Sequence, residues 1–136
     1  MRKHFIYGRS IQGRRKEKDS LIYVLRESTF RESVSVRLGG KSVYANYLVQ
    51  YKTATGQLQG RLFNFVYDPL ANEVRNLSRF EGGNRPGTGR AKEGQAISKA
   101  RELIEFALQS AILEWLPDRQ SRAGLQISLI GLYLNT

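Results

Sequence analysis

Aromatic rings and arginines alternate along one stretch of this sequence, and together these side chains could bind a nucleic acid. Arg61, Phe63 and Phe65 lie two residues apart in the segment GRLFNFVY. Residues at this spacing share one face of a β-strand. Exposed rings stack on nucleic-acid bases, and nearby cations attract the phosphates. The spacing therefore predicts a stacking platform for single-stranded RNA or DNA, provided that this face of the strand is exposed.

The composition of the platform depends on how the strand pairs with the strand before it. A four-residue turn over residues 53–56 would pair Tyr44 with Phe65 and Asn46 with Phe63. The predicted nucleic-acid-binding residues on that face are Arg37, Tyr44, Arg61, Phe63 and Phe65. A three-residue loop with a glycine bulge would shift the pairing by one residue, and the rings would then join the core. The sequence leaves both registers open.

Two basic, glycine-containing segments are further candidates for phosphate contacts. Residues 8–20 read as a loop or arm, and residues 81–92 as a glycine-rich loop before a helix. The candidate residues are Arg14, Arg15, Lys16, Lys18, Arg85, Arg90 and Lys92. The second loop fits neither common phosphate-loop pattern, because Thr88 stands where a Walker A motif needs lysine. The alternatives are a solvated loop for the first segment and a plain connection for the second.

The charge of the chain favours an acidic partner. The formal net charge is +10, and residues 1–52 carry twelve Lys/Arg against four Asp/Glu. A single domain this basic most often meets nucleic acid, although a basic surface also aids solubility. No apolar run is long enough to cross a bilayer. We therefore expect a nucleic-acid partner, no membrane and a cytoplasmic location.

Residues for catalysis are scarce. The chain has one histidine, His4, and no cysteine. A metal-dependent nuclease needs clustered carboxylates, and Asp68, Glu73 and Glu81 are scattered around predicted turns. We expect a non-catalytic protein without metal or cofactor, and keep a Mg²⁺-dependent nuclease using these three acids as a remote alternative.

The expected elements form a single α+β domain over residues 1–136. Alternating runs at 33–38 and 41–51 flank Gly39-Gly40 and predict a hairpin. Further strands are expected at 3–7, 20–25, 57–68 and, as a strand or a short helix, 73–82. A helix is expected over 90–116 and a final strand over 123–134. The prediction is an antiparallel sheet of about five or six strands with one long helix on one face.

Two apolar segments predict self-association. The second half of the helix, FALQSAILEWL, is apolar nearly all round, so a curled sheet or a second subunit must cover it. The final strand carries no charge, and we expect it to pair inside the sheet or across a subunit boundary. The partner class is a homo-oligomer or a larger complex, and the alternative function is a structural subunit of a coat or ribonucleoprotein assembly.

Overall fold

The computed structural model describes residues 11–17, 20–26, 37–77 and 94–134, and they form one antiparallel sheet with a long helix packed on it. The predicted α+β class and architecture are confirmed. The elements in chain order are β1 (Ile11–Glu17), β2 (Ser20–Leu25), β3 (Val43–Lys52), β4 (Leu58–Asp68), β5 (Glu73–Leu77), α3 (Gln95–Trp115), α4 (Arg119–Arg122) and β6 (Gln126–Leu134).

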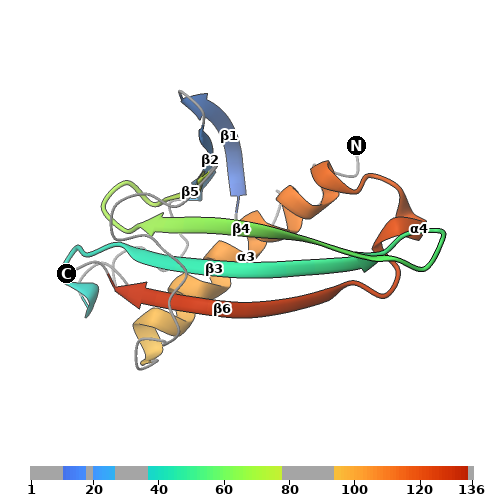
Figure 1. Cartoon of the computed structure of the whole chain (residues 1–136). Coiled ribbons are helices and arrows are strands. Elements are labelled where there is room, and N and C mark those ends of the chain that lie inside the picture. Colours follow the sequence, from blue (N-terminus) through green and yellow to red (C-terminus); the bar gives the residue numbers. More distant parts are fainter. Residues whose placement is uncertain (1–10, 18–19, 27–36, 78–93, 135–136) are drawn as a thin grey trace.

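The six strands lie in the order β1-β2-β5-β4-β3-β6. Strands β3, β4 and β6 are long and run side by side, and α3 crosses behind them at an angle (Figure 1). Strand β6 comes last in the order of the described elements but lies beside β3. Every neighbouring pair of strands in the sheet is antiparallel. We call the side that faces α3 the inner face and the opposite side the outer face.

The core lies between α3 and the inner face. Ala45 and Phe65 pair across β3 and β4, as do Tyr47 and Phe63, and all four side chains are buried. The helix contributes its own buried stripe, which includes Ala100, Leu103, Ile104 and Ala107. A curled sheet thus covers much of the apolar helix, which was one of the two expected ways to bury it.

The predicted register of β3 and β4 is wrong by one residue. Tyr44 pairs with Val66 rather than with Phe65. The connection uses five residues instead of four, and it is closed by a 2.8 Å hydrogen bond from Thr53 N to Gln57 O. Because strand side chains alternate between faces, this shift moves Phe63 and Phe65 to the inner face. They are 3% and 0% exposed. The rings are core residues, as the alternative register required, although the loop is longer rather than shorter.

The predicted hairpin around Gly39-Gly40 is also wrong. Both sides of β3 are occupied, by β4 and β6, so no edge remains for residues 33–38. Arg37 and Leu38 are helical, and Lys41 N donates a 3.1 Å hydrogen bond to Leu38 O. Both glycines have positive φ. Glycines in this conformation end helices as readily as they form hairpin turns, so the dipeptide alone does not distinguish the two. Residues 33–36 lie outside the described residues.

The segment predicted as a basic loop contains a strand. Residues 11–17 form β1, which pairs with β2 from Ile11 opposite Leu25 to Glu17 opposite Ser20. Ile11 is 1% exposed and anchors this strand in the core. Edge strands commonly carry charged side chains because these discourage pairing with other chains, which explains why a charge-rich segment can be a strand.

The helix and the last strand agree with the expected ranges. Helix α3 begins after Gly94 and ends before Leu116, because Pro117 disfavours helical geometry at the residue before it. Strand β6 falls within 123–134. The expected strand at 3–7 and residues 90–93 of the expected helix lie outside the described residues. Neither described helix is long and apolar enough to cross a membrane.

Candidate nucleic-acid interface

Three arginines from three different elements reach the end of helix α3. Arg14 of β1 forms an ion pair with Glu114. Arg61 of β4 places its guanidinium carbon 5.7 Å from the centre of the Trp115 ring. Arg122 of α4 donates a 2.7 Å hydrogen bond from Nη1 to the Leu116 carbonyl. Residues 114–116 are thus surrounded by cations that are far apart in the sequence.

Aromatic rings hold this arrangement together. The Trp115 ring packs edge-on against Tyr51, with ring centres 5.3 Å apart, and against Phe63, at 5.7 Å. The Arg61 guanidinium also lies 5.0 Å from the centre of the Phe63 ring. Such cation–π contacts contribute about 0.5–1 kcal/mol each at exposed positions. We call Arg14, Tyr51, Arg61, Phe63, Glu114, Trp115, Leu116 and Arg122 the helix-end cluster.

The arginines have a structural role as well as a possible binding role. The C-terminal end of a helix carries partial negative charge, and cations beside it are stabilising. Arg14 and Arg61 are nevertheless exposed, while Trp115 and Tyr51 are half-buried. An exposed ion pair contributes only about 0–1 kcal/mol. A phosphate could therefore compete with Glu114 for Arg14 without unfolding the region.

The remaining predicted platform residues are dispersed. Tyr44 lies on the outer face, opposite Tyr133 of β6, and is half-buried. Arg37 precedes β3, whereas Arg61 pairs with Val49 near the far end of that strand. Phe65 is fully buried. Of the five platform residues, only Arg61 and Phe63 enter the helix-end cluster, and Phe63 does so from the core.

The cations of β1 are divided between the two faces of the sheet. Arg15 lies on the outer face, where its guanidinium donates to both carboxylate oxygens of Glu73, at 2.7 and 3.3 Å. This hydrogen bonding and the charge of Glu73 raise the pKa of Arg15. Lys16 is exposed and alternates to the same face as Arg14. The other predicted cations, Lys18, Arg85, Arg90 and Lys92, lie outside the described residues.

Five members of the cluster were not among the sequence candidates: Tyr51, Glu114, Trp115, Leu116 and Arg122. Trp115 fitted the apolar repeat of the helix and Tyr51 the apolar face of β3. Their proximity to Arg61 depends on the β3–β4 register, which the sequence did not determine. Arg122 comes shortly after the helix end at Pro117. Basic side chains near a helix end can donate hydrogen bonds to its last carbonyls, and this position was the one sequence signal for the contact of Arg122.

The carboxylates considered for a nuclease have structural partners. Asp68 Oδ1 accepts hydrogen bonds from Leu70 N, at 3.0 Å, and from Ala71 N, at 3.4 Å, and so shapes the β4–β5 turn. Glu73 binds Arg15. Glu81 lies outside the described residues. Within the described part of the chain, no group of three His, Cys, Asp or Glu residues is placed to hold a metal ion.

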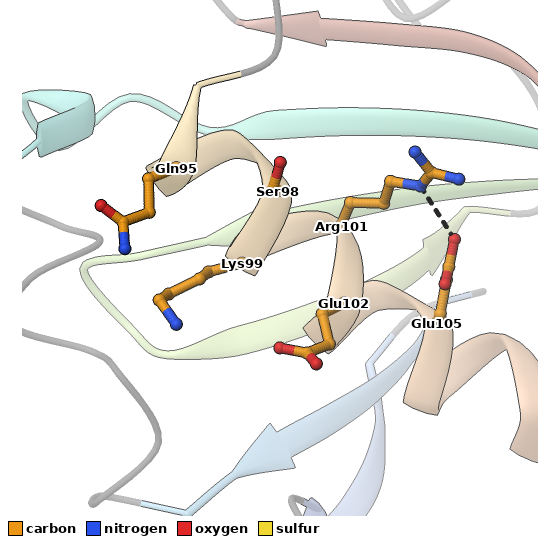
Figure 2. A pocket seen from close by; sticks show the side chains of 6 residues that line it. All are labelled: Gln95, Ser98, Lys99, Arg101, Glu102 and Glu105. Carbon is orange, nitrogen blue, oxygen red and sulfur yellow. Dashed lines mark hydrogen bonds and ion pairs between the residues drawn. The ribbon is translucent and has the colours of Figure 1, made fainter.

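A hollow along helix α3 offers little chemistry. It encloses about 430 Å³ along α3, and its described lining comes from this helix alone: Gln95, Ser98, Lys99, Arg101, Glu102 and Glu105 (Figure 2). Arg101 and Glu105 are joined by a 3.0 Å ion pair one helical turn apart. The lining mixes cations and carboxylates, as exposed helix surfaces commonly do. We therefore place the candidate site at the helix-end cluster and not in this hollow.

No protein-family model matches this chain, and comparisons with curated proteins and with solved structures give no significant match. Functional inference therefore depends on the residues and their geometry.

Proposed function

We propose that this chain is a non-catalytic nucleic-acid-binding protein that favours single-stranded RNA or DNA. The observation that carries the proposal is the convergence of Arg14, Arg61 and Arg122 on residues 114–116, in a chain of net charge +10. Arginines attract the phosphates, and the half-buried rings of Trp115 and Tyr51 offer aromatic surface for a base.

A single strand suits this cluster better than a duplex does. Trp115 and Tyr51 can stack only on a base that is free of its own stack, which duplex bases are not. Helix α3, the one long helix described, packs its apolar stripe on the sheet and carries both acidic and basic residues on its exposed side. It therefore lacks the features of a helix that enters a major groove.

The direct test is binding of labelled single-stranded oligonucleotides across a series of salt concentrations. We expect affinity to fall as salt rises, because each phosphate contact releases counterions. Trp115 is the single tryptophan of the chain, so its intrinsic fluorescence reports on this site alone. We expect oligonucleotide addition to change that fluorescence over the same concentration range as binding.

Arg61→Ala tests the location of the site. Arg61 is exposed, so we expect the variant to fold, to bind more weakly and to show a salt slope that is shallower by about 0.7 per lost phosphate contact. Lys41→Ala is the matched control, because it removes one exposed cation just before β3 begins, away from α3's end. Absence of binding at low salt would refute the function. Binding with unchanged Trp115 fluorescence and equal effects of both substitutions would refute only the location.

A further inference from the structure

Strand β6 forms an edge of the sheet. Among the described strands it pairs only with β3, whose other side is taken by β4. One side of its backbone therefore has no partner strand in the described part of the chain. Its first three residues, Gln126, Ile127 and Ser128, are exposed, whereas Gly131 and Leu132 are buried. The accessible part of the edge is its beginning.

The two edges of the sheet differ in charge. Strand β1 carries Arg14, Arg15, Lys16 and Glu17, whereas β6 carries no charged residue. Charged side chains on an edge oppose the addition of another strand, and an uncharged edge lacks this protection. In a chain of which 25% of the residues are charged, a nine-residue uncharged edge strand is unusual.

A groove lined by both apolar and polar side chains runs beside this edge on the inner face. It encloses about 190 Å³ between α3 and β6, and Leu108, Ile112, Ile127 and Leu129 supply its apolar lining. Ile127 is 50% exposed. The groove's polar end holds Arg101 and Glu105, which pair with each other. The surface next to the open edge therefore offers four aliphatic side chains and has no excess of either charge.

We propose that β6 docks on β6 of a second copy of this chain, so that two sheets join into one across a two-fold axis. Antiparallel pairing of β6 with itself supplies main-chain partners to the open edges of both copies. It also keeps inner-face residues opposite inner-face residues, so Ile127 and Leu129 of the two copies meet beside the paired grooves. This inference does not depend on the proposed nucleic-acid binding.

The chemistry of the two edges favours a second copy as the partner. The occupant must be an extended, uncharged, largely apolar strand, and β6 is such a strand in every copy of the chain. Pairing of β6 with β1 would set arginines beside Ile127 and would leave free edges for further addition. Pairing of β6 with β6 is isologous and closes as a dimer. It also keeps the charged β1 strands at the outer edges.

Single-cysteine variants test the geometry, because the natural chain has no cysteine. We expect Ser128→Cys to form a disulfide-linked dimer under mild oxidation, since identical residues near the axis approach each other closely. Leu70→Cys is the control, because Leu70 is 63% exposed on the β4–β5 turn, away from β6. Cross-linking of Ser128→Cys no greater than that of Leu70→Cys would overturn the proposal.

The oligomeric state of the full chain gives an independent measurement. We expect sedimentation or light scattering to give twice the 15.5 kDa chain mass, and Ile127→Glu to shift the protein to the monomer with an unchanged circular dichroism spectrum. Leu70→Glu should leave the dimer intact. A wild-type monomer, an assembly larger than a dimer, or equal dissociation by both substitutions would contradict docking at β6. If Ile127→Glu unfolds, the cross-linking comparison still decides.

Discussion

Tyr47 joins the sheet to the helix through a buried hydroxyl. It is 1% exposed, and its hydroxyl donates a 3.0 Å hydrogen bond to Glu105 Oε2. Burial raises the pKa of Tyr47 above its ordinary value of 10.0, and the charge and hydrogen bond of Glu105 raise it further. The folded protein therefore holds this proton at a pH where the unfolded chain has released it.

The raised pKa predicts a loss of stability at alkaline pH. Tyr47 favours folding fully below its unfolded pKa, and the free energy of unfolding falls as the pH rises above about 10, by roughly 1.4 kcal/mol per pH unit for one proton. Tyr47→Phe should lower stability at neutral pH by about 0.5–1.5 kcal/mol through the lost hydrogen bond. In the Tyr47→Phe variant the free energy of unfolding should also fall less steeply above pH 10 than in the wild-type protein. Urea titrations of both proteins from pH 8 to pH 11 measure this, and equal slopes would contradict it.

Gly131 gives a second prediction at the level of one residue. A Cβ placed there would lie 2.6 Å from Asn46 Oδ1 and 2.8 Å from the Tyr133 hydroxyl. Asn46 cannot readily move, because it is fully buried and its Nδ2 donates a 2.9 Å hydrogen bond to Asn64 Oδ1. We expect Gly131→Ala to cost about 1–3 kcal/mol of stability.

Gly13→Ala is the control for that substitution. Gly13 also lies in a strand, but a Cβ there would meet nothing within 4 Å. Its replacement should change the urea midpoint little. Similar midpoints for the two variants would show that space at Gly131 is not limiting.

At the level of the element, strand β4 decides which aromatic rings are available to a ligand. Its side chains alternate between the core and the outer face, so Phe63 and Phe65 are buried while Leu62 is 42% exposed. The alternation itself was evident in the sequence. Which of its two faces points inward was not evident, because both are apolar and the loop that sets the register can take several lengths.

The two faces of β4 predict different mutational costs. Phe65→Ala should destabilise the protein by about 3–5 kcal/mol, because it leaves a cavity between Tyr47 and α3's buried stripe. Leu62→Ala on the outer face should cost far less. Thermal or urea unfolding of both variants gives the comparison, and a mild effect of Phe65→Ala with a severe one of Leu62→Ala would invert the assignment of faces.

Over the whole molecule, short sequence patterns predicted most of the helices and strands. They did not predict which strands pair when these are far apart in the chain. Pro117 and the apolar repeat located the end of α3, and β-branched and aromatic runs located β2, β4 and β6. The pairing of β3 with β4 was predicted from their short connection, but its other neighbour, β6, could not be found locally because it lies far along the chain. The sequence pattern of β1 was also ambiguous, since an edge strand and a solvated loop both tolerate charge.

The candidate site shows the same division. Arg14 and Arg61 were predicted from residue type, but they were expected in an arm and on an aromatic platform. Their meeting at residues 114–116 requires β1 and β4 to lie at the same end of α3, which follows from the whole sheet and from no single segment. The sequence thus predicted which residues could bind a phosphate more readily than where in the fold these residues meet.

The position of β6 has a consequence for biosynthesis. The ribosome makes β3 well before β6, yet the two strands lie side by side from Val43 opposite Leu134 to Gln50 opposite Gln126. Until β6 has been synthesised, one edge of β3 has no partner strand, and the core position that Leu132 fills in the folded protein is empty. Contacts so distant along the chain also slow folding. The sheet of the nascent protein therefore remains incomplete until β6 has been made, and during that interval its exposed β3 edge is what a chaperone would have to shield.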